Sequence, residues 1–233
     1  RYIMKNLFTV LTFLLAIGIH AGHHEKGEMA ESTHSNNFVY MSTYTQPAGG
    51  NPEILKKSLL KNIDDLEKNG YNRCGMLRHQ FGGDRSFLTY CYFDDWEQFA
   101  EINDNAEPLS GGSRQLFGDH TDNIAAVLVR NATVQMPYVL EAKYIFGPYL
   151  TDNQKRANAR ILFDAYDRAF GGCNMAEHVW GPELSWNFYC GYESYADFAK
   201  KVTILSKIHE EELADKKLDV KDHSDHMMQR VYR

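Results

Sequence analysis

The fold is decided by the stretch Cys74–Ala100, CGMLRHQFGGDRSFLTYCYFDDWEQFA, together with Cys173–Ala199, CNMAEHVWGPELSWNFYCGYESYADFA. The two stretches align without a gap at a shift of 99 residues, and nine of the 27 positions are identical. The identical pairs are Cys74/Cys173, Met76/Met175, His79/His178, Gly82/Gly181, Ser86/Ser185, Tyr90/Tyr189, Cys91/Cys190, Phe99/Phe198 and Ala100/Ala199. Further along, DHTD at 119–122 is echoed by DHSD at 222–225. The sequence therefore predicts a structural unit that occurs twice.

Each copy has the same predicted order of elements. Short runs rich in Val, Ile, Tyr and Phe predict strands, and apolar residues at helical spacing predict helices. The predicted strands are 37–44, 73–81, 85–93 and 125–134 in the first copy, and 137–146, 173–180, 184–192 and 226–232 in the second. The predicted helices are 52–69 and 152–170, with a second helix after Asp94 and after Glu193. The order βαββαβ, repeated, indicates an α+β protein of two ferredoxin-like units.

The division of the chain follows from the repeat. We expect the first ferredoxin-like repeat at 37–135 and the second at 136–233. Before them, Met4 and Lys5 lead into an apolar run at 7–19, which is typical of a secretory signal peptide over 1–21. A membrane anchor is the alternative for this segment, although the run is shorter than a spanning helix. Residues 22–36 are expected to form a flexible tail.

The repeated βαββαβ order resembles the dimeric α/β-barrel superfamily, in which two antiparallel ferredoxin-like sheets pack face to face. Here the pseudo-dimer would form within a single chain. The superfamily includes cofactor-independent oxygenases, isomerases, haem-handling enzymes and chlorite-dismutase-like proteins. The resemblance rests on element order and duplication, and no catalytic motif of those proteins can be placed on residues of this sequence.

The four cysteines test the predicted hairpins. A two-residue turn at 82–83 places Cys74 opposite Cys91, and a turn at 181–182 places Cys173 opposite Cys190. Both pairs fall at non-hydrogen-bonded positions, where Cα atoms approach to about 4.5 Å, within the range of a disulfide. Two structural disulfides are the favoured interpretation, and a redox-active pair is the alternative. Disulfides and a signal peptide predict a secreted or periplasmic protein.

Strand alternation predicts which side chains face the partner sheet. Cys74 and Met76 suit the helix-covered face. Side chains at the alternate positions of these strands would therefore face the other sheet. The candidate pocket residues are His79, Phe81 and Tyr90 in the first copy, and His178, Trp180, Asn187 and Tyr189 in the second. The histidines could act as bases, hydrogen-bond donors or ligands of a metal or haem, each oriented by the serine opposite. They could equally be packed structural histidines, and the tyrosines plain core aromatics.

A second group of polar candidates is Asp119 and His120 with their counterparts Asp222 and His223. An Asp–His pair could form an oriented base or part of a metal site. The same residues are also common in turns, where their side chains satisfy nearby backbone groups. His226 adds an imidazole in the second copy alone.

These observations favour a protein that binds or transforms a small apolar or aromatic molecule between the two sheets. If it is an enzyme, it would be a cofactor-independent oxygenase or isomerase, or a haem-handling protein. No motif requires a cofactor or metal, so haem, a metal or neither is left open. The alternative is a non-catalytic structural or interaction module whose inter-sheet core is filled by side chains. The formal charge of −6, without basic clusters, argues against a nucleic-acid partner. No stable membrane insertion is expected after signal removal, and free edge strands would allow a homo-oligomer.

Overall fold

The computed structural model describes residues 35–81, 85–111 and 116–233. The predicted signal peptide, and the predicted tail up to residue 34, lie outside the described residues. Within the described part, no helix is both long and apolar enough to cross a membrane. The first copy contains β1 (Phe38–Thr45), α1 (Pro52–Lys68), β2 (Arg73–Phe81), β3 (Ser86–Phe93), α2 (Trp96–Asn105) and β4 (Asp119–Arg130). The second contains β5 (Tyr138–Phe146), α3 (Asp152–Phe170), β6 (Cys173–Trp180), β7 (Trp186–Tyr192), α4 (Tyr195–Ile208), a π-helical turn (His209–Leu213) and β8 (Val220–Tyr232).

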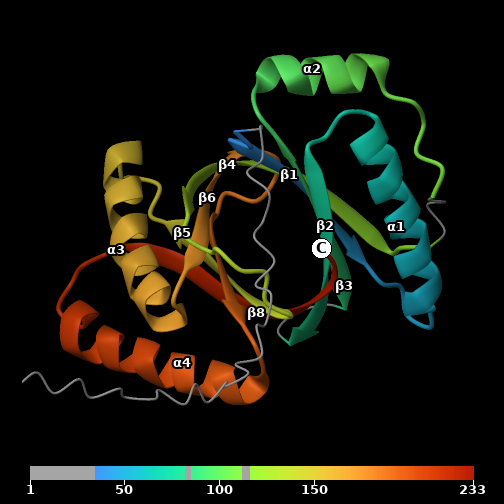
Figure 1. Cartoon of the computed structure of the whole chain (residues 1–233). Helices are drawn as coiled ribbons and strands as arrows, with labels where there is room; N and C mark the ends of the chain where they lie inside the picture. Colours follow the sequence, from blue (N-terminus) through green and yellow to red (C-terminus); the bar gives the residue numbers. More distant parts are fainter. Residues whose placement is uncertain (1–34, 82–84, 112–115) are drawn as a thin grey trace, which may run out of the picture. The chain divides into compact units, whose positions relative to one another are not determined.

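The eight strands form one closed antiparallel barrel in the order β1-β3-β2-β8-β5-β7-β6-β4. Each copy contributes a four-stranded sheet, and the sheets join where β4 pairs with β6 and where β2 pairs with β8. Helices α1 and α2 lie outside the first sheet, and α3 and α4 lie outside the second (Figure 1). The predicted fold class is confirmed. The edges that could have paired with another chain are instead used within this one, because closure satisfies their backbone groups.

The helices begin where the sequence predicts. Asn51 caps α1, accepting hydrogen bonds from the backbone amides of Glu53 (2.9 Å) and Ile54 (3.4 Å), and Pro52 occupies the first turn. Thr151 and Gln154 form a reciprocal capping box at the start of α3. These local signals fix the helix ends that flank the barrel.

Both predicted disulfides are confirmed. Cys74 pairs with Cys91 across β2 and β3, and Cys173 pairs with Cys190 across β6 and β7, with Cα–Cα distances of 4.0 and 4.4 Å. The register that predicted them is therefore correct in both hairpins. The first turn, 82–84, lies outside the described residues.

Alternation divides the core into three layers. Cys74, Met76 and Phe87 pack under the helices of the first copy, and an equivalent cluster packs under those of the second. Leu77 and Leu88 belong to a separate cluster inside the barrel, with Tyr90 packed against it. The apolar faces of the two sheets therefore shield each other.

The last strand of each copy begins earlier than predicted. The sequence analysis expected polar turns at 119–122 and 222–225, followed by strands from 125 and 226. Instead, β4 begins at Asp119 and β8 at Val220, and His120 and His223 pair with Tyr44 and Tyr144 of the neighbouring strands. The polar residues are tolerated because this end of each strand is exposed, while backbone pairing continues through it.

Candidate functional site

The barrel interior has a polar wall that comes mainly from the second copy. Glu141 on β5 lies directly across from His226 on β8 and from Tyr189 on β7. Two residues further along β5, Lys143 faces the interior on the same side. At the matching positions of β1 the first copy carries Met41 and Thr43. The duplicated halves have thus diverged, and charge is concentrated on one side of the barrel.

Glu141 is the most deeply buried of these charged groups, with 3% of its surface exposed. Its carboxylate accepts a hydrogen bond of 3.0 Å from the Tyr189 hydroxyl. Burial raises the pKa of the Glu141 carboxyl, and this outweighs the nearby Lys143 ammonium, which acts to lower it. A carboxyl in this setting can hold a proton at higher pH than an ordinary glutamate.

Lys143 links the buried carboxyl to a second one nearer the surface. Its ammonium lies 3.8 Å from Glu141 and 2.9 Å from Glu183. Burial alone would lower the pKa of Lys143, but the two carboxylates outweigh it, so the pKa is raised and the lysine stays charged. The wall therefore keeps a fixed positive charge beside a carboxyl that can change state.

Two histidines from different copies meet next to this wall. His226 Nδ1 lies 3.4 Å from His79 Nε2, and the rings are 5.4 Å apart. Burial lowers the pKa of His226, and the Lys143 charge lowers it further. A neutral imidazole can donate at one nitrogen and accept at the other, so the pair can share a hydrogen bond.

These groups border an open cavity of about 570 Å³, called here the histidine cavity. Its lining combines hydroxyl and apolar side chains with polar and charged groups: Thr43, Thr45, Leu88 and Met228, and His79, His226, Glu141, Lys143, Glu183, Lys221 and Asp222. A concave space with a mixed lining and a few converging polar groups is the usual makeup of a small-molecule site.

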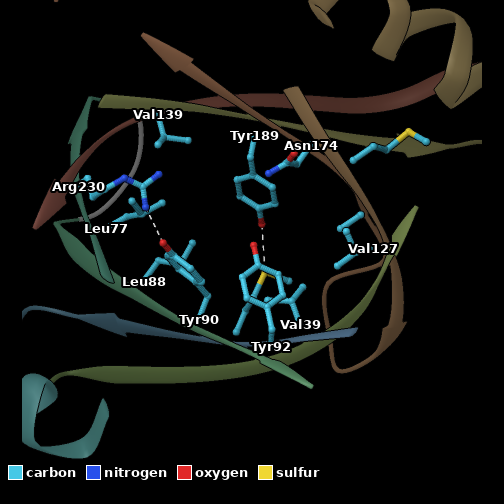
Figure 2. A pocket seen from close by; sticks show the side chains of 13 residues that line it. Val39, Leu77, Leu88, Tyr90, Tyr92, Val127, Val139, Asn174, Tyr189 and Arg230 are labelled. Atoms are coloured by element: carbon cyan, nitrogen blue, oxygen red, sulfur yellow. Dashed lines mark hydrogen bonds between the residues drawn. The ribbon is translucent and has the colours of Figure 1, made fainter. Parts of the chain in front are cut away.

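A smaller cavity of about 80 Å³, called here the tyrosine cavity, lies towards the other end of the barrel. Figure 2 shows Tyr90, Tyr92 and Tyr189 around it, with Arg230 beside Tyr90. Tyr90 can lie flat against β2 because Gly75 is opposite it; a Cβ there would come within 2.3 Å of the phenol. Between the two cavities, side chains such as Leu77, Leu88 and Met228 fill the interior.

The structure distributes the predicted pocket residues over several places. His79 borders the histidine cavity, whereas Tyr90 and Tyr189 border the tyrosine cavity. His178 borders neither of these, and its buried Nδ1 has no hydrogen-bond partner among the described residues. Asn187 is buried and accepts from the Ser185 hydroxyl at 2.9 Å, so that serine does not orient His178.

Phe81 and Trp180 do not follow the inward alternation, and they are 62% and 72% exposed. In both copies the register shifts immediately after the repeated histidine, between His79 and Phe81 on β2 and between His178 and Trp180 on β6. A bulge reverses the face of the residues beyond it. Phe81 accordingly packs outside the barrel against Tyr195.

In both copies, the histidine of the Asp–His candidates contacts the second aspartate of its motif and stacks on a tyrosine of the helix-bearing face. His120 Nε2 lies 3.0 Å from Asp122, and its ring stacks on Tyr44 at 4.5 Å. Their counterparts repeat this arrangement: His223 Nε2 lies 3.3 Å from Asp225, and the His223 ring stacks on Tyr144 at 4.2 Å. In each copy the preceding aspartate, Asp119 or Asp222, accepts from the histidine backbone amide. Asp222 and His223 also border the mouth of the histidine cavity.

Sequence reasoning missed Glu141, Lys143, Glu183 and Arg230. A signal was present for the first two, because a Glu and a Lys interrupt an otherwise apolar strand, Tyr138–Phe146. Charged residues are rarely buried unless they are paired or functional, so this pattern marks the strand as a further candidate for the site.

The described residues show no metal centre. Within 35–81, 85–111 and 116–233, no group of three or more His, Cys, Asp or Glu could hold a metal ion. The imidazoles of His79 and His226 are bonded to each other. Charges of both signs line the histidine cavity: the carboxylates of Glu141, Glu183 and Asp222, and the ammonium groups of Lys143 and Lys221.

The raised pKa of Glu141 predicts a pH dependence of the free energy of unfolding. Because its pKa is higher in the folded than in the unfolded chain, its proton stabilises the fold fully below about pH 4.3, the usual glutamate value. That contribution is lost as the pH rises through the folded-state pKa. We expect Glu141→Gln to gain stability relative to the wild type as the pH rises from 4 to 8, measured by urea unfolding. Glu101→Gln on the exposed face of α2 is the control, and parallel curves for wild type and Glu141→Gln would contradict the assignment.

Comparison with known proteins supports the fold. No family model matches the chain, and no curated protein matches it. A proposed monooxygenase from Fusobacterium nucleatum subsp. nucleatum superimposes with a TM-score of 0.58 at 8% identity, over 83% of this chain and 91% of that one. A proposed monooxygenase from Lactobacillus acidophilus superimposes with a TM-score of 0.53 at 10% identity, over 83% and 93%. The resemblance to the dimeric α/β barrel is confirmed at the level of the fold.

Proposed function

We propose, from the premise that this chain is a dimeric α/β barrel with both halves in one polypeptide, that it binds a small apolar or aromatic molecule in the histidine cavity. Glu141, His79 and His226 would there exchange a proton with a hydroxyl or enol group of the bound molecule. The observation that carries the proposal is the buried Glu141 carboxyl, which lies across from His226 and beside an open cavity of about 570 Å³. The two disulfides support export of the protein, since they persist in oxidising compartments.

The mixed lining defines the ligand. Apolar side chains such as Leu88 and Met228 suit a hydrocarbon or aromatic body, and the same lining presents two imidazoles, a carboxyl and an ammonium. A neutral His226 can accept a proton from a bound O–H. The Lys143 ammonium then stabilises the anion that remains. No step of this exchange calls for a cofactor.

The alternative of a binding or structural module with a filled interior applies to the middle of the barrel alone. Leu77, Leu88, Val139 and Met228 are packed there. The open space towards the hairpin end, and the charged groups around it, favour a ligand-binding role instead. Glu141 and Lys143 are paired within the wall, but burying charged groups is costly even so, and a purely structural core would not need them.

A titration with 1-naphthol tests the proposal, because its absorption spectrum distinguishes the neutral phenol from the naphtholate. We expect saturable binding by the disulfide-bonded chain, with naphtholate appearing at lower pH than in free solution. His79→Gln should weaken binding about ten-fold, which corresponds to about 1.4 kcal/mol. His120→Gln is the matched control, because that histidine lies on the helix-bearing face and stacks on Tyr44. Absence of saturable binding, or equal effects of the two substitutions, would overturn the proposal.

A further inference from the structure

One carboxylate at the histidine cavity comes from a loop and not from a strand. Glu183 lies in the loop 181–185, which joins β6 to β7, and four residues of that loop border the cavity. Loops that border a cavity commonly contribute to ligand recognition, because the scaffold behind them holds their side chains in place. The position of Glu183 therefore bears on which ligands the cavity accepts.

The loop is fixed against a neighbouring strand. The Glu183 amide donates to Asn123 Oδ1 on β4 at 3.1 Å, and Asn123 is buried. Gly181 allows this close approach, because its φ of 112° suits glycine and an added Cβ would collide with Asn123 Oδ1. The Glu183 side chain thus extends from a backbone whose place is set by packing and by a hydrogen bond.

Both oxygens of the Glu183 carboxylate contact Lys143. The lysine Nζ donates to Oε1 at 3.1 Å and to Oε2 at 2.9 Å, whereas the Glu141 carboxylate lies further from it, at 3.8 Å. The side chains of this pair are partly buried, so salt and solvent screen it less than a surface ion pair. Glu183 is therefore the main partner of the Lys143 charge.

The charges around Lys143 favour a neutral ligand. One ammonium lies between two carboxylates, and an anionic ligand would have to compete with Glu183 for it. Burial is the main cause of the raised pKa of Glu141, and the Glu183 carboxylate raises that pKa further, so its charge acts inside the barrel. Lys221 and Asp222, the other charged residues of the lining, are exposed and opposite in sign, and solvent screens them.

We propose that Glu183 is a specificity-determining residue of the histidine cavity: by holding Lys143 it disfavours ligands that arrive as anions and selects neutral ones. The inference rests on the function proposed above, and it narrows the ligand class to phenols, enols and similar molecules that bind in their protonated form. Such a ligand becomes negative only when it gives its proton to His226, and the charge of the complex is then unchanged. Discrimination arises here by weakening the binding of the wrong ligand.

Two probes of matched shape test the inference: 1-naphthoate, which is ionised at neutral pH, and its neutral isostere 1-naphthamide. Binding to the disulfide-bonded chain is measured by isothermal titration calorimetry at constant ionic strength. We expect the wild type to bind the amide at least about ten-fold more tightly. Glu183→Gln should tighten naphthoate binding about ten-fold and change naphthamide binding less than about three-fold. A loss of structure would weaken both probes together, so the ratio of the two affinities reports on charge.

Glu177→Gln is the matched control. Glu177 lies on the same hairpin and pairs with Arg156 at 2.7 Å, but it does not border the histidine cavity, so both affinities should be unchanged. An unchanged ratio in Glu183→Gln, or the same change in Glu177→Gln, would overturn the inference and leave the proposed function in place. Absence of saturable binding of 1-naphthol and of both probes would instead overturn the proposed function, and the inference with it.

A double-mutant cycle tests whether Glu183 acts through Lys143. In a Lys143→Met background, Glu183→Gln should tighten naphthoate binding by less than about three-fold, because no ammonium is released to the ligand. Equal tightening in the two backgrounds would contradict the role assigned to Lys143.

Discussion

Phe188→Ala is expected to lower the free energy of unfolding by about 3–5 kcal/mol, the usual cost of removing a large aromatic side chain from a core. Phe188 is fully buried on the helix-facing side of β7. Its ring packs against those of Tyr144, Phe163 and Tyr166 at centre distances of 5.3–5.6 Å. The substitution therefore leaves a cavity between the sheet and α3 that these rings cannot fill without moving.

Urea unfolding followed by circular dichroism measures this loss. Phe81→Ala is the matched control, because Phe81 is the same residue type at the end of another strand and is 62% exposed. We expect the control to change stability by no more than about 0.5 kcal/mol. A similar loss in both variants would show that the layer under α3 is not the packed core described above.

Removal of one disulfide is expected to have the next largest effect. Each disulfide closes a loop with a sequence separation of 17 residues. In the chain-entropy model this stabilises the fold by about 3 kcal/mol, because the crosslink restricts the unfolded chain. Cys173→Ser with Cys190→Ser should therefore lower the unfolding free energy by about that amount, measured by urea unfolding under non-reducing conditions.

The duplication supplies the control for this prediction. Cys74→Ser with Cys91→Ser opens a loop of the same length in the other copy, so the two double variants should lose equal stability within about 1 kcal/mol. If both disulfides serve a redox function instead, their reduction would be reversible at mild potentials and would cost little stability. A loss well below 1 kcal/mol in both variants would support that alternative.

Strand alternation in the sequence predicted only part of the site. Alternation correctly placed Tyr90 and Cys74 on opposite faces, because a strand directs successive side chains to opposite sides. It did not foresee the bulges that turn Phe81 and Trp180 outwards. The sequence comparison also did not select Glu141 as a site residue. Comparison of the two copies selects residues that occur in both, and Glu141 occurs in one copy alone.

The sequence by itself determined the duplicated βαββαβ unit, the starts of α1 and α3 and the two disulfides, since these depend on neighbours close along the chain and on the turn between two paired strands. Only the tertiary structure decided that β2 pairs with β8 and β4 with β6. That closure brings His79 beside His226, 147 residues apart in sequence, next to Glu141, which lies across from His226 within the second sheet. Periodicity specifies which side chains of a strand share a face, but it does not specify which strand of the other repeat lies beside it. That neighbour is decided when the two apolar sheet faces are buried against each other and their free edges pair.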